Sequence, residues 1–133
     1  MLMFVNSSLD NLNLQGNHLG KDGAFQTLRA VEVNSKLKEL NFSDNQIADS
    51  KILIDQLISV IENNQVIFLI NLNFNGIMQE AAEKLLVAMK KKMRPKIELT
   101  DRFSQEFVAE YNAVLMKIRP PKEARPKKKP NAK

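Results

Sequence analysis

The chain has 133 residues, of which 44% are hydrophobic and 26% charged, and it carries a formal net charge of +5 with no Cys and one His. The length suits one domain with a short extension, and the missing Cys excludes a disulfide scaffold, a thiolate metal site and a cysteine nucleophile. A single His cannot build a multi-histidine metal centre, and no apolar run reaches the ~18 residues of a membrane span, so we expect a cytoplasmic protein.

Three segments of the chain repeat one pattern without gaps. Residues 6–19, 34–47 and 64–77 each begin with Asn, and Asn recurs at the eighth and twelfth positions of each segment. Apolar residues occupy the fourth and fourteenth positions, and an apolar pair occupies the seventh and ninth, with one residue between them. In a strand, alternate side chains point to opposite faces, so the apolar pair is expected to face a core. Self-similarity at spacings of 28 and 30 residues indicates a repeat architecture.

The sequence predicts a helix after each repeated segment. The first covers residues 22–33, the second residues 50–62 and the third residues 79–92, because apolar side chains recur in each at three- and four-residue spacings. After Pro95, residues 97–99 are expected to form a last short strand. Residues 101–118 are expected to form a closing helix that shields the end of the array, with Asp101 as its N-cap.

The repeated segments resemble the leucine-rich-repeat signature L-x-x-L-x-L-x-x-N-x-L, and the period is similar to that of the ribonuclease-inhibitor-like subtype. This resemblance implies an α/β solenoid of about three repeats plus a C-terminal capping helix. Its parallel strands would line a concave face and its helices a convex face. In the family the repeat Asn binds the turning backbone, so Asn17, Asn45 and Asn75 are expected to be buried and equivalent.

The beginning of the chain matches the end of a helical segment. Residues 1–5 precede Asn6 as residues 29–33 precede Asn34. Because solenoid ends need polar caps, we expect either the C-terminal end of a longer array or a chain whose open N-terminal edge docks on another repeat or chain. The alternative is that residues 1–4 fold back as a small cap.

The variable positions around each strand are the expected binding surface, since they line the concave face in this family. They form a polar, amide-rich and weakly acidic surface with an apolar end. For the Asn13, Asn41 and Asn71 row, two interpretations stay open: contact with a partner, or a ladder of amides that satisfy one another. The predicted partner-binding residues are Asn11, Asn13, Gln15, Glu39, Asn41, Ser43, Asp44, Leu69, Asn71, Asn73 and Phe74.

The sequence contains no motif for catalysis or cofactor binding. Its carboxylates lack the paired apolar setting that raises one pKa for acid–base work, and Asp44-Asn-Gln lacks the Gly and terminal Glu of an EF-hand loop. Gly-rich phosphate loops and zinc-protease motifs are also missing. We therefore expect no enzymatic activity, no cofactor and no bound metal.

Residues 119–133 differ in composition from residues 1–118, which we expect to form the solenoid with its cap. Residues 117–133 hold eight basic residues and one acidic residue, so the other 116 residues carry a net charge of −2. Four Pro and no large apolar residue predict a disordered tail for residues 119–133. Its basic residues include Lys122, Arg125, Lys127, Lys128 and Lys129. This tail could bind an acidic partner, act as a localisation signal, or simply solubilise the chain.

These features favour a non-catalytic protein–protein interaction module or scaffold with a protein partner. One alternative is a structural subunit of a cytoskeletal or ciliary (axonemal) complex, anchored by the basic tail and the open N-terminal edge. Another is nucleic-acid binding through the tail, although the tail has no aromatic residue to stack on bases. For the tail, the expected acidic partners are tubulin-like tails, nucleic acid or anionic lipid. A fold alone does not identify a partner.

Overall fold

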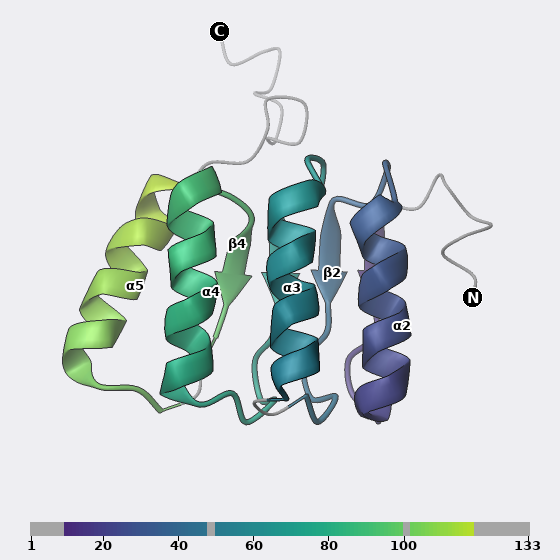
Figure 1. Cartoon of the computed structure of the whole chain (residues 1–133), viewed down its shortest axis with the longest axis horizontal. Helices are drawn as coiled ribbons and strands as arrows, with labels where there is room; N and C mark the ends of the chain where they lie inside the picture. Colours follow the sequence, from purple (N-terminus) through teal and green to yellow (C-terminus); the bar gives the residue numbers. More distant parts are fainter. Residues whose placement is uncertain (1–9, 48–49, 100–101, 119–133) are drawn as a thin grey trace, which may run out of the picture.

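Parallel strands and helices alternate along the chain in the computed structural model, which describes residues 10–47, 50–99 and 102–118 (Figure 1). In this part of the chain the strands pair in chain order. The strands are β1 (Asn11–Asn13), β2 (Glu39–Asn41), β3 (Leu69–Asn71) and β4 (Lys96–Glu98), and the helices are α2 (Gly20–Val33), α3 (Lys51–Asn63), α4 (Gln79–Lys92) and α5 (Gln105–Lys117). The predicted leucine-rich-repeat solenoid is confirmed: three strand–helix repeats are followed by a fourth strand and a closing helix.

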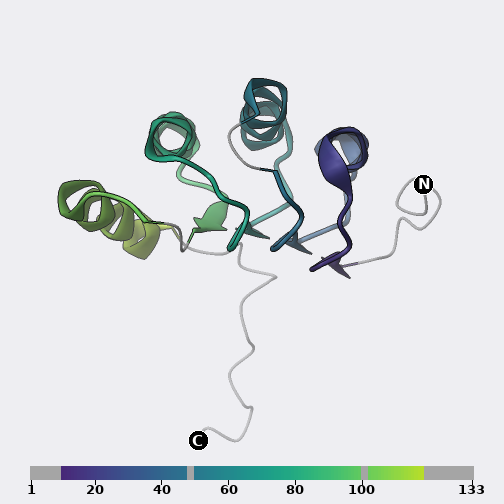
Figure 2. The same cartoon turned by 90° about the horizontal axis from the view of Figure 1, so that it is seen from below.

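The helices form the convex side of an arc and the strands line its concave side (Figure 2). The strand register places Leu40, Ile70 and Ile97 side by side at the centre of β2, β3 and β4. Their side chains are at most 1% exposed because they point from the sheet toward the helices. The residues on either side of them point to the concave face, as the alternation along a strand requires.

Each of the first three helices buries one face because its apolar residues recur every three or four positions. The α4 helix begins and ends where the sequence predicts, and α2 begins two residues earlier, at Gly20. Burying a Leu or Ile side chain contributes ~1.5–3 kcal/mol, so these faces hold the helices on the sheet. The buried apolar residues of α3 are Leu53, Ile54, Leu57, Val60 and Ile61.

A carboxylate joins α2 to α3. Glu32 accepts hydrogen bonds from Gln56 Nε2 at 2.7 Å and from Ser59 Oγ and Asn63 Nδ2 at 2.8 Å each. Burial by itself raises the pKa of Glu32, but these three hydrogen bonds and the positive charge of Arg29 outweigh it and lower that pKa. The charged form of Glu32 is therefore the one that holds the two helices together.

The closing helix is shorter than the sequence predicts. It begins at Gln105, and its N-cap is Ser104, whose Oγ accepts a hydrogen bond from the Phe107 backbone N–H at 3.1 Å. The expectation that Asp101 caps this helix is therefore wrong, because the helix begins four residues later. Asp101 itself lies outside the described residues.

The α5 helix is fixed to the last strand through one buried hydroxyl group. Tyr111 donates a hydrogen bond to the Ile97 carbonyl at 2.7 Å, and its hydroxyl also lies 3.6 Å from Met89 Sδ of α4. Burial and the nearby charge of Glu98 raise the pKa of Tyr111 far above its ordinary value. β4 begins at Lys96, one residue before the predicted strand, because the Lys96 backbone N–H pairs with the Phe68 carbonyl at 2.8 Å.

Candidate functional site

Two rows of side chains cover the concave face of the sheet. The first row is formed by the first residue of each strand, and the second row by the third residue. A hollow of about 260 Å³ lies on this face, and we call it the central hollow. The rows, which together we call the concave face, are Asn11, Glu39, Leu69 and Lys96, and then Asn13, Asn41, Asn71 and Glu98.

Two members of these rows, Lys96 and Glu98, are not identified by the sequence pattern. They belong to β4, which has no repeat Asn after it and departs from the regular spacing. One signal could have found them: Ile97 lies 27 residues after Ile70, close to the repeat period, so its two neighbours take the row positions.

A second, smaller hollow adjoins the concave face at its β4 end. This end hollow has a volume of about 200 Å³ and is lined by Phe68, Leu69, Lys96, Glu98 and Ile118. Leu69 and Glu98 also line the central hollow, so the two hollows are neighbours. Ile118 is 4% exposed and is the last residue that the structure describes.

The asparagine row does not form a ladder of amides. Asn41 Oδ1 accepts hydrogen bonds from the backbone N–H of Ser43 at 3.1 Å and from its hydroxyl at 2.8 Å. Asn13 and Asn71 likewise accept from the backbone N–H two positions further on, at 3.0 and 2.9 Å. Such Asx turns shape the ends of β1, β2 and β3. In them the amide oxygen binds the backbone of its own chain segment and not the amide of the neighbouring Asn. The Asn41 amide donates to Gln15 Oε1 at 3.2 Å.

The next row is less uniform than the sequence predicts. Gln15 is exposed and Asn73 is half-buried, but Ser43 is only 3% exposed. The expectation that Ser43 lies on the accessible surface is therefore wrong: its side chain is buried, and its hydroxyl donates a hydrogen bond to Asn41 Oδ1. Asn73 Oδ1 is buried without a hydrogen-bond donor in the described part of the chain.

The turns after β1, β2 and β3 each contain a residue in the left-handed region. Gly16, Asp44 and Phe74 occupy this equivalent position, with φ of 69°, 56° and 61°. Gly and Asp tolerate such a φ, whereas a bulky aromatic residue there is unusual. The Phe74 side chain is 68% exposed, so it gains little from packing within the described chain.

The repeat asparagines link each repeat to the one before it. Asn75 Nδ2 donates to the Phe42 carbonyl at 2.9 Å, and Asn45 Nδ2 donates to the Leu14 carbonyl at 2.8 Å. Both side chains are buried, as the sequence predicts. Asn17 is exposed, and among the described residues its amide donates to the Gln15 carbonyl alone, at 3.4 Å. The expected equivalence of Asn17 is wrong because no described strand lies before β1.

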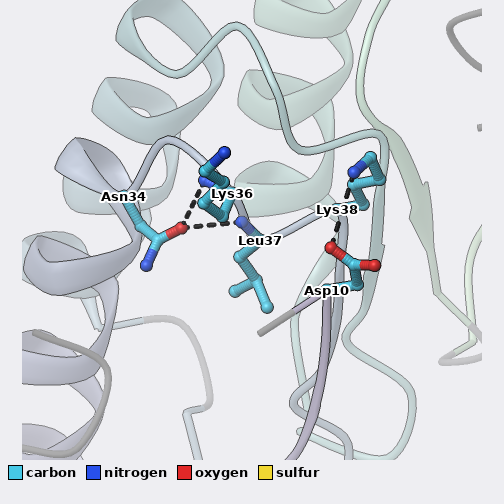
Figure 3. Close-up of polar contacts among 5 residues, drawn as sticks. All are labelled: Asp10, Asn34, Lys36, Leu37 and Lys38. Atoms are coloured by element: carbon cyan, nitrogen blue, oxygen red, sulfur yellow. Dashed lines mark hydrogen bonds and ion pairs between the residues drawn. The ribbon is translucent and has the colours of Figure 1, made fainter. Parts of the chain in front are cut away.

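A second set of side chains links the repeats at the opposite end of the strands. Asn64 Nδ2 donates to the Asn34 carbonyl at 3.0 Å, and one Arg94 guanidinium nitrogen donates to the Asn64 carbonyl at 2.7 Å. Asn34 Oδ1 accepts from the backbone N–H of Lys36 and Leu37 (Figure 3). In the part of the chain that is described, the Asn34 amide NH2 has no preceding repeat to bind. Within the described residues, β1 is therefore the first strand of the sheet.

The charged residues of the concave face are two carboxylates, Glu39 and Glu98, and one cation, Lys96. Lys38 forms an ion pair with Asp10 at 3.5 Å, beside β1 and β2 (Figure 3). The carboxylates of Glu39 and Glu98 line the central hollow and make no ion pair with another described residue. Lys96 is the cation of the first row.

The described residues offer little for metal chemistry. His, Asp and Glu side chains do not gather there in groups of three that could hold a metal ion. His18 is exposed in the turn that follows β1, at a φ of 48°. None of the described helices is both long enough and apolar enough to cross a membrane.

Comparisons with known proteins identify the repeat and the fold. A family model described as "Leucine Rich repeat" matches residues 5–25 and 33–50. A search of curated protein sequences found no significant match.

Two solved structures are similar to the chain over most of its length. A structure titled "Leiomodin-1 Actin-Binding Site 2 (ABS2)" matches with a TM-score of 0.66 and 14% identity, over 80% of this chain and 64% of that one. The tropomodulin C-terminal domain of Caenorhabditis elegans matches with a TM-score of 0.57 and 13% identity, over 87% of both chains. The chain thus spans less than two thirds of the leiomodin structure, and at these identities the likeness concerns the fold.

Proposed function

We propose that this leucine-rich-repeat protein is a non-catalytic interaction module that binds a protein partner through its concave face and the turns that follow the strands. The observation that carries the proposal is Phe74, an aromatic side chain that is 68% exposed at a left-handed φ of 61°. A left-handed backbone costs an L-residue ~1–2 kcal/mol, and an exposed ring does not recover this cost by packing. Strained, exposed residues of this kind are candidates for contact with a ligand or partner.

The polar groups of the concave face are suited to a protein partner. Asn11 and Asn13 are exposed, and Glu39 and Asn71 are half-buried around the central hollow. Amide groups both donate and accept hydrogen bonds, so they suit the peptide groups and polar side chains of a protein. Leu69 adds an apolar contact, and aromatic anchors such as Phe74 often dominate binding energy at interfaces.

The second candidate function is a structural subunit of a cytoskeletal complex. It is favoured by the leiomodin structure, whose title names an actin-binding site. In this proposal the β1 edge docks on a further repeat or another chain, and the basic tail, with Lys122, Arg125, Lys127, Lys128 and Lys129, supplies an electrostatic contact to an acidic protein surface. We propose a cytoskeletal location on the same grounds, and a ciliary one as its special case.

Nucleic-acid binding through the tail is the third candidate and has less support. The tail carries basic residues but no aromatic ring to stack on a base. The concave face offers the carboxylates Glu39 and Glu98, which repel phosphate.

Site-specific photo-crosslinking tests which face binds the partner. A photoreactive phenylalanine analogue would replace Phe74 in the turn after β3 or Asn11 on the concave face, and Val87 or Met116 on exposed helix positions as matched controls. We expect crosslinked protein adducts from Phe74 and Asn11 only. Adducts that form from Val87 and Met116 but not from Phe74 and Asn11 would place the binding surface on the helices and contradict the proposal.

Purified actin is the first defined partner to test for the cytoskeletal candidate. We expect the full chain to bind actin in a titration and the Phe74→Ala variant to bind at least ~10-fold more weakly, because ~1.4 kcal/mol of anchor contact is lost. The Met116→Ala variant is the control, since this Met is 82% exposed on α5. If actin does not bind, the cytoskeletal candidate loses its first support, while the crosslinking result still decides the role of the face.

A further inference from the structure

The described chain ends at the concave face. Ile118 lines the end hollow together with Leu69 and Glu98, and these two residues also line the central hollow. Residues 119–133 therefore start beside a path that runs across the strands from β4 to β1. Wherever the rest of this segment lies, its local concentration near the concave face is high because it is tethered there.

The net charge of residues 119–133 is opposite to the charge of the carboxylates on the concave face. Glu39 and Glu98 line the central hollow without an ion pair to another described residue, and Lys38 is already paired with Asp10 at 3.5 Å. Lys96 is the opposing cation on the face. Residues 119–133 contain seven basic residues and one acidic residue, a net charge of +6.

The dimensions of the path agree with the length of the segment. Neighbouring strands lie ~4.8 Å apart, so β1 is ~15 Å from β4 and β2 is ~10 Å from β4. A proline-rich segment favours an extended helix that rises ~3.1 Å per residue, so 15 residues reach ~45 Å. Lys122 and Arg125 are three residues apart, which is one turn of that helix and ~9 Å. The strands of Glu98 and Glu39 are ~10 Å apart across the sheet, and the offset of two residues between their rows adds ~7 Å along the strands, so the two carboxylates are ~12 Å apart and within reach of two long basic side chains.

We propose that residues 119–133 bind the concave face of their own chain, with Lys122 and Arg125 opposite Glu98 and Glu39. The tail is then an intramolecular competitor for the protein partner. This proposal rests on the proposed function of the concave face. It also defines the partner more closely: a partner that displaces the tail presents an extended, basic segment of its own.

A different acidic hollow lies between α4 and α5, with a volume of about 270 Å³, and it suits the tail less well. Its Glu110 is paired with Lys90 at 3.0 Å, and its Glu83 accepts a hydrogen bond from Gln79 at 3.1 Å. Ile118 does not line this hollow, so the tail does not start there. Binding at this second site is an outcome that the experiment can detect.

A spin label on the tail tests the proposal in the full chain without any partner. Because the chain has no Cys, the substitution Lys128→Cys provides a single labelling site. We expect the label to broaden the NMR signals of backbone amides in β1 and β2, such as those of Asn13 and Asn41, more strongly than those of α3, which lies behind the sheet. The broadening should be lost in ~0.5 M NaCl, which shortens the screening length to a few ångströms.

Charge reversal separates a specific contact from general proximity. The double variant Glu39→Lys and Glu98→Lys should lose the broadening, and reversing Lys122 and Arg125 to Glu in that background should restore it. The matched control is Glu62→Lys with Glu83→Lys, which makes the same charge change on exposed helix positions and should keep the broadening. Unchanged helix chemical shifts show that each variant is folded.

Three results would overturn the proposal: no broadening in the wild-type chain, broadening confined to the α4–α5 hollow, or broadening that disappears on dilution because tails bind other copies. Since the measurement uses no partner, its failure is distinct from failure of the proposed function. If the tail does not contact the face while concave-face variants still lose the partner, the proposed function stands alone. If the tail contacts the face but those variants keep the partner, the proposed function fails.

Discussion

Replacing the repeat Asn of the middle repeat tests how the repeats are held together. In Asn45→Leu a side chain of similar bulk remains, but the amide that donates to the Leu14, Phe42 and Ser43 carbonyls at 2.8, 3.2 and 3.1 Å is lost. Asn45 is 0% exposed, so water cannot replace it without local opening. The expected effect is therefore on the stability of the whole solenoid.

The size of the stability loss follows from the hydrogen bonds that each of the three carbonyls retains in the variant. The Phe42 carbonyl still accepts from Asn75 and the Ser43 carbonyl from the Gly16 backbone N–H, so each loses one bond worth ~0.5–1.5 kcal/mol. The Leu14 carbonyl is left without a described donor, which costs ~1–3 kcal/mol. Together the free energy of unfolding should fall by ~3 kcal/mol, a large part of the 5–15 kcal/mol typical of a domain.

Urea unfolding followed by circular dichroism measures this change. With a slope of ~1–3 kcal/mol per molar urea, the midpoint should fall by roughly 1–3 M. The matched control is Asn17→Leu, the same substitution at the same repeat position, where the side chain is exposed and its bond to Gln15 is 3.4 Å long. It should cost less than ~1 kcal/mol. Equal losses in the two variants would refute the reasoning that the preceding repeat makes the difference.

Three further predictions concern the binding face and the closing contacts. Phe74→Asn should leave the free energy of unfolding in urea melts unchanged or raise it by up to ~1 kcal/mol, because Asn tolerates the left-handed φ. Partner binding should weaken. A clear loss of stability would contradict the inference that Phe74 has a strained backbone. The folded pKa of Glu32 is lowered, so its charge stabilises the fold fully above about 4.5 and this stabilisation is lost as the pH falls through the folded pKa. The difference in free energy of unfolding between wild type and Glu32→Gln should therefore become smaller in urea melts below that pH. A difference that does not change with pH would exclude a stabilising role for the negative charge of Glu32. Tyr111→Phe should cost ~1–3 kcal/mol and speed amide exchange in α5, because the Ile97 carbonyl loses its donor; unchanged exchange would mean that α5 is held elsewhere.

The repeat pattern was enough to predict the core and the arrangement of the sheet. Leu40 and Ile70 recur with the repeat period and lie side by side, since the same residues at the same spacing must form the same unit. The left-handed φ of Phe74 could also be predicted from the sequence, because Phe74 aligns in the repeat with Gly16, a residue type that favours that region. The placement of Leu40 and Ile70 and the φ of Phe74 could thus be predicted without knowledge of the rest of the fold.

Other features depend on contacts that no local pattern encodes. Ser43 is buried because Asn41 captures its hydroxyl, and Asn17 is exposed because its binding site would belong to a preceding strand. Lys96 and Glu98 belong to the concave face because β4 pairs with β3, and their one signal in the sequence is the 27-residue spacing between Ile70 and Ile97. The role of the concave face and the boundary of the tail at residue 119 stay predictions.

The most direct test of the central claim is a binding titration against the protein that crosslinks to the concave face, comparing Glu39→Lys with Glu62→Lys. Both variants make the same charge change, but Glu39 is on the concave face and Glu62 is exposed on α3. A function that depends on the concave face predicts at least ~10-fold weaker binding for Glu39→Lys, a loss of ~1.4 kcal/mol, and unchanged binding for Glu62→Lys. Unchanged binding for Glu39→Lys together with weaker binding for Glu62→Lys would contradict it.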